Sequence, residues 1–377
     1  MTPASKREIT IAVQGATVAV ASPHTEVTDW VASYFGPWWP AARGDTVAFT
    51  VVAREEPVRY EAVTVAVTQS GFEETGYPRV PTRYARYGDG TVYAVAPEDR
   101  IAYRWSPGRR RMTVYGSKTL VDPLARATAR VSRELIRAQL IDQGWCLLHA
   151  SAAVLPGGQA VLVLGNRGAG KTTTAFCLTT VGAELLANDR VFARPAPDGD
   201  GVELLAWPSG AAVGLGLMNA LGWTRIAARR LAQGMVPHTS QDGEVTAALH
   251  GEWTDPVLGG DGRELKAHLR PEEFAWYGVR TVATGRVATA LFPRVEAGAT
   301  PHLVEGGPPP DVEPGHFMTG SQEDSYPDVF GLTGGRGAGQ PGARAALCTA
   351  LASMPRRRLV LGHDIGANAA FVAGLLP

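Results

Sequence analysis

The sequence of 377 residues has few cysteines, no excess of charge of either sign and no long apolar run. The three cysteines, Cys146, Cys177 and Cys348, lie far apart without CxxC spacing, which argues against a disulfide framework and a zinc site. Basic and acidic residues number 36 each, so the overall charge gives no attraction to nucleic acid. We expect a cytoplasmic protein without a nucleic-acid partner.

The sequence also shows no signal-peptide pattern and no uninterrupted apolar stretch typical of a membrane span. Its start, MTPASKREITIAV, has no apolar h-region. The longest uncharged stretch, Leu204 to Trp223, contains Pro208 and several glycines, which predicts a buried strand, a loop and a short helix instead of a span. We therefore expect no membrane partner.

Short β-branched runs dominate the first third of the chain. ITIAVQGATVAVAS, DTVAFTVVA, EAVTVAVTQ, GTVYAVA and RMTVYG are punctuated by Gly, Pro and Asp, as strands are. They predict a smaller β-rich N-terminal domain over residues 1–118, a candidate for substrate recognition. FGPWWP, from Phe35 to Pro40, could form a recognition surface, but turn residues packed under a sheet are the commoner explanation.

The hydrophobic period becomes helical from Asp122 to Asp142, with a cap at Asp122–Pro123 and a stop at Gly144. Strands CLLHASAAVL, AVLVL and AELLAND then alternate with a glycine loop and a helix from Lys171 to Val181. This alternation predicts an α/β domain over residues 119–377. Gly- and Pro-rich segments near 305–343 predict long loops, and RRLVLGHDIGANAAFVAGLL predicts a closing βα unit.

The most specific motif is GNRGAGKT at 165–172, which fits the P-loop (Walker A) pattern GxxxxGK[ST] in full. It follows an apolar strand and precedes a helix, as the pattern requires. Backbone N–H groups of such a loop point at phosphate oxygens, and the helix N-terminus adds positive partial charge. Lys171 would neutralise the β- and γ-phosphates, and Thr172 would ligate Mg²⁺. The expected nucleotide-binding residues are Gly165, Asn166, Arg167, Gly168, Ala169, Gly170, Lys171, Thr172 and Thr173.

The stretch LLANDRV at 185–191 places a single carboxylate at the end of an apolar strand. In P-loop proteins a strand of this kind ends in an acidic residue that holds the metal, directly or through water. Asp189 is therefore the expected Mg²⁺ partner of Thr172. The alternative is a surface carboxylate that pairs with Arg190.

Four features of the chain together resemble the kinase domain of HPr kinase/phosphorylase. They are His149 before a strand and a GG turn, the P-loop with its helix, VGAELLANDRV, and the later ELKAHLRPEE. The P-loop relatives of that domain include kinases of modified-peptide pathways. The resemblance covers residues 149–191 well and reaches Pro271 weakly. It implies a P-loop fold related to phosphoenolpyruvate carboxykinase, phosphate transfer to a serine hydroxyl and, by analogy, a homo-oligomer.

Two residues depart from the family pattern. Family members usually have glycine after the histidine, where this chain has Ala150, and two aspartates at the end of the strand, where this chain has Asn188 and Asp189. The first aspartate serves the family as general base, and an amide cannot take a proton at any useful pH. The base is therefore missing, relocated to His149, or unnecessary because positioning and charge neutralisation carry most phosphoryl transfer.

These observations predict an Mg²⁺-dependent kinase that transfers the γ-phosphoryl of ATP or GTP to a hydroxyl on a peptide, protein or small metabolite. Its candidate catalytic residues are Lys171, Asp189, His149 and Asn188, with Thr172 and Asp189 on the metal. The alternative is a P-loop ATPase or nucleotide switch without an acceptor, in which Asn188 records a lost base. Carboxykinase chemistry is a third option, and no motif distinguishes ATP, GTP and pyrophosphate as donors.

Weaker candidates lie outside these motifs. Lys266 and Arg270 are either a second clamp on the phosphates or solvated helix residues. Arg336 in GGRGAG is either part of a glycine-hinged lid or, as we favour, part of a linker. His363 and Asp364 follow an apolar strand but have no third partner, so they receive no role.

Overall fold

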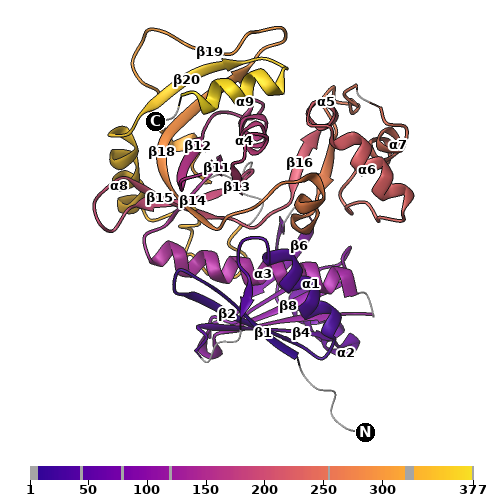
Figure 1. The fold of residues 1–377 in the computed structure, drawn as a ribbon. Helices are drawn as coiled ribbons and strands as arrows, with labels where there is room; N and C mark the ends of the chain where they lie inside the picture. The colour runs from indigo at the N-terminus through magenta and orange to yellow at the C-terminus, as the bar shows by residue number, and fades with distance from the viewer. Residues whose placement is uncertain are drawn as a thin grey trace. The chain divides into compact units, whose positions relative to one another are not determined.

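The computed structural model describes residues 7–42, 46–77, 80–118, 121–253, 255–318 and 327–375. The protein is a mixed α/β protein with two large mixed sheets, one of them a curled half-barrel (Figure 1). The chain divides into two compact units, which are residues 1–145 with 318–340 and residues 146–317 with 341–377. Among the described residues, no helix is both long and apolar enough to cross a bilayer.

Unit 1 contains a sheet with the strand order β3-β1-β2-β4-β9-β8-β7-β6-β5. β4 pairs in parallel with β2 and β9, and the other neighbours are antiparallel. The strands are β1 (Arg7–Val13), β2 (Ala16–Ser22), β3 (Ala41–Ala42), β4 (Phe49–Glu55), β5 (Glu73–Gly76), β6 (Pro81–Arg86), β7 (Val92–Ala96), β8 (Ile101–Ser106) and β9 (Arg111–Gly116). The helices are α1 (Thr25–Phe35), α2 (Pro57–Gln69), η1 (Pro107–Arg109) and α3 (Val121–Asp142).

EAVTVAVTQ is not the strand that its alternation predicts, because it forms most of helix α2. Pro57 begins the helix, where its missing N–H costs no hydrogen bond. Tyr60, Val63 and Val67 recur at helical spacing and are buried against side chains of β7, β8 and β9. Alternating valines fit either period, and here the packing against the sheet selects the helix.

Helix α3 matches the predicted helix closely but packs on β2, β4 and β9 of the first sheet. The two compact units divide after Trp145, whereas the sequence predicts a domain boundary after residue 118. FGPWWP lies at the end of α1, where Phe35, Trp38 and Trp39 are buried and the rings of Phe35 and Trp39 stack with centroids 5.7 Å apart. These aromatics are packing residues, as the turn interpretation expects.

The glycine-rich segment from 327 to 340 belongs to unit 1 and is tied to it. The ring of Phe330 makes edge contacts with those of Tyr77 and Tyr103, each at 5.7 Å between centroids. The Asp328 carboxylate accepts backbone N–H bonds from within the loop, including that of Leu332 at 2.6 Å. The segment is therefore an ordered loop with its own hydrogen bonds.

Unit 2 contains the curled sheet, with the strand order β10-β14-β15-β18-β12-β11-β13 and with β20 and β19 beyond β18. Its strands are β10 (Cys146–Leu148), β11 (Ser151–Val154), β12 (Gln159–Val163), β13 (Glu184–Ala187), β14 (Val191–Pro195), β15 (Val202–Ala206), β18 (Thr284–Val295), β19 (His302–Leu303) and β20 (Arg356–Leu361). A small sheet pairs β16 (Ala211–Gly214) with β17 (Lys266–Leu269). The helices are α4 (Lys171–Thr179), α5 (Leu215–Ala220), α6 (Trp223–Ala232), α7 (Gly243–His250), η2 (Pro271–Tyr277), η3 (Pro314–His316), α8 (Pro341–Ala352) and α9 (Ile365–Ala373).

Two short links force this sheet to curl. β10 and β11 are five strand positions apart, which would be about 24 Å in a flat sheet, yet the chain from Leu148 to Ser151 reaches only about 10 Å. The same argument holds for β13 and β14, which are joined between Ala187 and Val191. The two edges must therefore approach each other, and the links at 149–150 and 188–190 cross between them.

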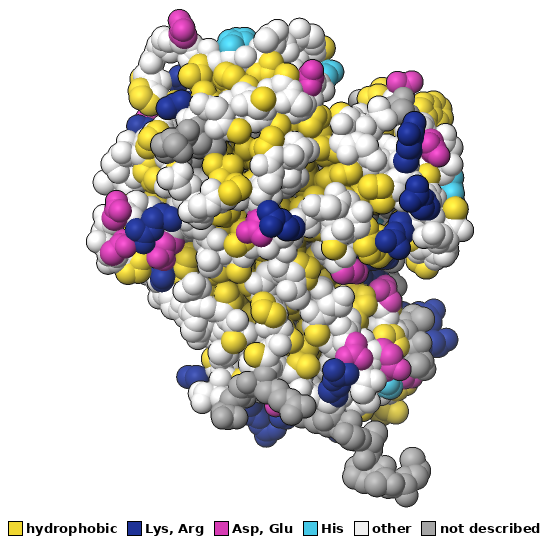
Figure 2. Space-filling model, in the orientation of Figure 1, with side chains coloured by type: hydrophobic (Ala, Val, Ile, Leu, Met, Phe, Trp, Pro, Cys, Tyr) yellow, Lys and Arg dark blue, Asp and Glu magenta, His cyan; other side chains and the backbone are white. Residues whose placement is uncertain are grey.

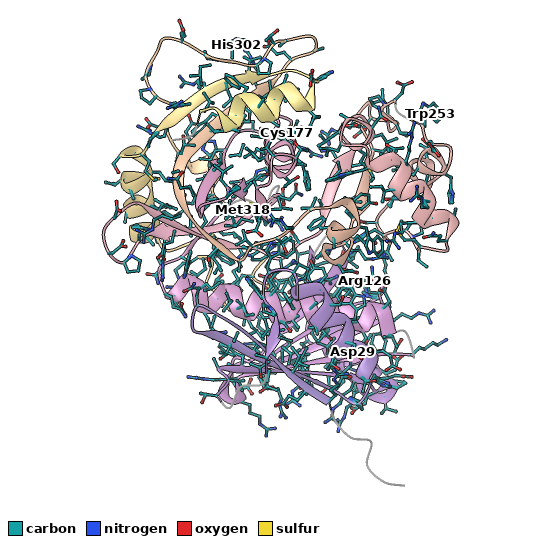
Figure 3. The ribbon with its side chains drawn as sticks, viewed as in Figure 1. Asp29, Arg126, Cys177, Trp253, His302 and Met318 are labelled. Carbon is teal, nitrogen blue, oxygen red and sulfur yellow. The ribbon has the colours of Figure 1, made fainter. Side chains whose placement is uncertain are left out.

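A hydrophobic core supports the sheet beneath α4 and α9. Its members come from β11, β12, β18, β20 and both helices, and α4 packs against α9. Figure 3 labels Cys177 on α4, which is fully buried. On the face in Figure 2, basic and acidic side chains stand in small mixed groups.

Candidate functional site

The glycine loop joins β12 to α4 and depends on positive backbone φ angles. Gly165, Gly168 and Gly170 have φ of 145°, 82° and 103°. A Cβ at Gly170 would lie 2.5 Å from Val295 Cγ2, whereas one at Gly168 would meet nothing within 4 Å. Glycine is therefore required at 168 for conformation and at 170 for conformation and space.

Lys171 begins α4 and is folded back over the loop. Its Nζ donates to the carbonyl of Gly165 at 2.8 Å and to that of Asn166 at 3.1 Å, and the residue is only 7% exposed. Thr172 and Thr173 lie half-buried in the first helical turn, while Arg167 is exposed. The sequence motif thus forms a compact loop with an ammonium group held against it.

His149 and Asp189 lie in the two links that cross between the edges of the curled sheet. His149 Nε2 is 3.4 Å from Asp189 Oδ1. Ser151, just after His149, pairs with Val163 at the end of β12, and Ala187 pairs with Ala152. Both links therefore lie at the end of the sheet where β12 passes into the glycine loop.

Surrounding charges keep Asp189 ionised. Its side chain is 48% exposed, and its Oδ2 lies 3.7 Å from Arg190 Nε. Desolvation raises the pKa of Asp189, but the hydrogen bond from His149 and the positive charges of Arg190, His149 and Lys171 hold the pKa well below its usual range. A carboxylate of this kind suits a cation and is a weak base. The ion pair with Arg190, which the sequence offered as the alternative to a metal role, is therefore present, together with a second partner in His149.

Asn188 contributes a buried amide beside this carboxylate. The residue is 6% exposed, and its Oδ1 has no hydrogen-bond partner among the described residues. Its main-chain carbonyl accepts a hydrogen bond from the buried Ser151 hydroxyl, which ties the second link to β11. A buried acceptor without a partner costs about 1–3 kcal/mol, so Oδ1 is a binding position for a donor on a ligand or water.

The oxygen atoms at this site suit Mg²⁺, which takes few ligands from protein, better than they suit a metal ion that is bound by protein side chains alone. No group of three His, Cys, Asp or Glu that could hold a metal occurs in the described parts of the chain. Mg²⁺ binds through one or two carboxylates with waters and substrate phosphates completing its shell. Asp189 and the Thr172 hydroxyl supply oxygens of this type.

The structure adds His316, which sequence reasoning missed. His149 N–H donates to the His316 carbonyl at 2.8 Å, so the two histidines are backbone neighbours. His316 lies in a Pro- and Gly-rich stretch, where the sequence signals only a turn. Its place at the site follows from a long-range strand bridge between Leu148 and Phe317.

Three of the weaker candidates, Arg270, Arg336 and Asp364, have structural partners. In ELKAHLRP the residues Lys266–Leu269 form strand β17, not a helix, and Lys266 is exposed at its start, as His363 is after β20. Arg270 Nη1 is bonded to Glu273 and to the carbonyl of Val236. Arg336 donates to the Thr333 carbonyl and lies 3.6 Å from Asp142 within unit 1. Asp364 caps α9 by accepting the Ala367 N–H at 2.9 Å.

No protein-family model matches the chain, and no curated protein matches its sequence.

Proposed function

We propose that the chain is an Mg²⁺-dependent P-loop phosphotransferase of the HPr kinase/phosphorylase-like class. The donor is ATP or GTP, and the acceptor is a hydroxyl on a peptide, protein or small metabolite. The observation that carries the proposal is the His149–Asp189 pair, 3.4 Å apart, at the end of the sheet where the glycine loop and Lys171 begin. A phosphate loop, a cation and an ionised carboxylate are the parts that phosphoryl transfer requires.

The loop and Lys171 bind the phosphates in this scheme. Nucleotide phosphates replace the Gly165 and Asn166 carbonyls as partners of the Lys171 ammonium, and the loop N–H groups donate to phosphate oxygens. Asp189 and Thr172 would hold the metal ion, which neutralises charge on the β- and γ-phosphates when bound.

The proton of the acceptor hydroxyl goes to His149. Asp189 is a weak base because its pKa is low, and Asn188 takes no proton. As the acceptor oxygen bonds to the γ-phosphorus and the bond to the nucleoside diphosphate breaks, His149 accepts the proton. The carboxylate 3.4 Å away stabilises the resulting imidazolium. The buried Asn188 Oδ1 orients the acceptor by accepting a hydrogen bond from another donor group of the acceptor or from a water, because the single proton of the reacting hydroxyl goes to His149.

The test is a phosphorus NMR time course of Mg·ATP, and separately Mg·GTP, with the protein and with peptide and metabolite fractions. A new phosphoester signal that requires both a fraction and Lys171 supports the proposal, with Lys171→Ala as the control. If Lys171→Ala transfers phosphate like the wild type, the assignment is wrong.

The amide at Asn188 favours one alternative, a nucleotide switch or slow ATPase that has lost its base. In that case the protein releases only inorganic phosphate, at the same rate whatever fraction is added. Asn188→Asp separates the two functions. A gain of transfer to a hydroxyl indicates a lost kinase base, whereas a loss indicates that the amide is matched to its present acceptor.

A further inference from the structure

The backbone of His316 is fixed beside His149. η3 ends at His316, and Phe317 bridges Leu148 at the end of β10. The His149 N–H donates to the His316 carbonyl at 2.8 Å. His316 is thus bound to the same link that carries His149 into the site.

The imidazole of His316 also lies against the strand next to the phosphate loop. It packs edge-on to Phe292 of β18, with ring centroids 5.8 Å apart. The preceding residue, Leu291, accepts the N–H of Leu164, directly before Gly165, at 2.9 Å. Two separate contacts therefore place His316 beside the His149 link and beside β18, the strand that is hydrogen-bonded to Leu164 directly before the glycine loop.

Its tautomer is set by the turn. The Glu313 N–H donates to His316 Nδ1 at 2.9 Å, so Nδ1 is the acceptor and the neutral ring carries its proton on Nε2. Burial and the positive charges of Lys171 and His149 lower the pKa of His316, while the Glu313 carboxylate raises it. The ring is therefore a neutral Nε2–H donor at physiological pH.

We propose that His316 is a phosphate-binding residue of this site and that its Nε2–H donates a hydrogen bond to the terminal phosphate of the bound nucleotide. The inference rests on the proposed function, because it needs a phosphate on the loop. A neutral donor adds a hydrogen bond to the phosphate without placing a further positive charge beside Lys171 and beside His149, which must accept a proton during transfer.

A pair of substitutions separates the two ring nitrogens. His316→Asn keeps an acceptor near the position of Nδ1 and loses the donor at Nε2, whereas His316→Gln keeps a donor near Nε2 and loses the acceptor. We expect His316→Asn to weaken Mg·ATP and Mg·GTP binding about tenfold or more, with AMP binding unchanged. His316→Gln should stay within about threefold of the wild type. The control is His302→Asn, at an exposed position on β19 (Figure 3).

Calorimetric titration measures these affinities, and nitrogen-15 NMR of the histidines gives an independent readout. The His316 Nε2 signal should be that of a protonated nitrogen and should move on saturation with Mg·ATP but not with AMP. His316→Asn binding as tightly as wild type, or His316→Gln losing as much as His316→Asn, would overturn the inference and leave the kinase proposal standing. If the wild type binds neither triphosphate, both proposals fail together.

Discussion

His149 Nε2 and Asp189 Oδ1 are 3.4 Å apart because the two links that carry them cross between the edges of one curled sheet. Neither residue is part of a regular strand, and each link is too short to take another path. The pair is therefore a consequence of strand order. A sheet that opened would separate the His149 imidazole from the Asp189 carboxylate.

The first prediction concerns this pair. His149→Gln should lower kcat for phosphoryl transfer by about 10²- to 10⁴-fold, because the base is lost, while KM for Mg·ATP changes little. Asp189→Asn should lower kcat and also raise the Mg²⁺ concentration that gives half-maximal activity, because Asp189 would hold the metal ion. Steady-state kinetics over a Mg²⁺ series measure both effects, with His302→Gln as the control. Unchanged kcat in His149→Gln would remove His149 from the mechanism.

The second prediction compares two glycines of the loop. Both have positive φ, but only Gly170 is also crowded, by Val295. Gly168→Ala should cost about 1 kcal/mol through backbone strain, and Gly170→Ala about 1–3 kcal/mol more through overpacking. Urea unfolding and Mg·ATP titration measure the effects on stability and on the loop.

Removing the crowding tests the physical cause. Adding Val295→Ala to Gly170→Ala removes the contact between the new Cβ and Val295. The double variant should therefore regain the nucleotide affinity that was lost through this contact, but not the affinity that was lost through strain at the positive φ of residue 170. Equal losses for Gly168→Ala and Gly170→Ala would show that space at position 170 does not matter.

Local sequence signals sufficed for the elements whose pattern is unambiguous. The helix at 121–142, the loop with α4, and the closing βα unit follow from helical periodicity, the P-loop pattern and an apolar run. EAVTVAVTQ failed because alternating Val and Thr fit a strand as well as they fit α2, and only burial of Tyr60, Val63 and Val67 on the sheet decides.

Long-range relationships could not be read from the sequence. His149 and Asp189 were candidates through family resemblance, but their separation depends on how the sheet curls. His316 had no motif, because its position comes from the bridge between Leu148 and Phe317. The segment from 327 to 340 is rich in glycine, yet the ring of Phe330 packs on Tyr77 and the Asp328 carbonyl accepts a hydrogen bond from Arg86, which attaches the segment to unit 1.

The third prediction concerns pH. Glu272 Oε2 is buried without a hydrogen-bond partner among the described residues, and burial, with the neighbouring Glu273 charge, raises the pKa of Glu272 against the opposing charge of Arg270. The folded state therefore binds the proton more tightly than the unfolded state. The contribution of Glu272 to stability is fully present below the ordinary glutamate pKa of about 4.3 and is lost as the pH rises through the raised folded value.

Glu272→Gln removes this ionisation. The variant should be more stable than wild type at pH 7 by about 1 kcal/mol and should lose less stability between pH 4 and 7. Urea unfolding across this range measures the slope, and Glu305→Gln, at an exposed position, is the control. Parallel slopes for Glu272→Gln and wild type would show that Glu272 does not cause the pH dependence.

The fourth prediction concerns the packing of the glycine-rich segment in unit 1. The Arg137 guanidinium is 1% exposed, donates from Nε to the Gly337 carbonyl at 2.6 Å, and pairs with Glu134 at 3.1 Å. A Cβ at Gly337 would collide with this guanidinium. Gly337→Ala must therefore displace either the segment or a buried charge, which should lower the free energy of unfolding by about 3 kcal/mol.

Hydrogen–deuterium exchange measures this displacement. In Gly337→Ala the exchange should become faster in α3 and in residues 327–340. The control is Gly342→Ala, whose added Cβ meets nothing within 4 Å and which should leave α3 and residues 327–340 protected. Equal protection in the two variants would mean that the segment does not depend on Arg137 for its attachment to unit 1.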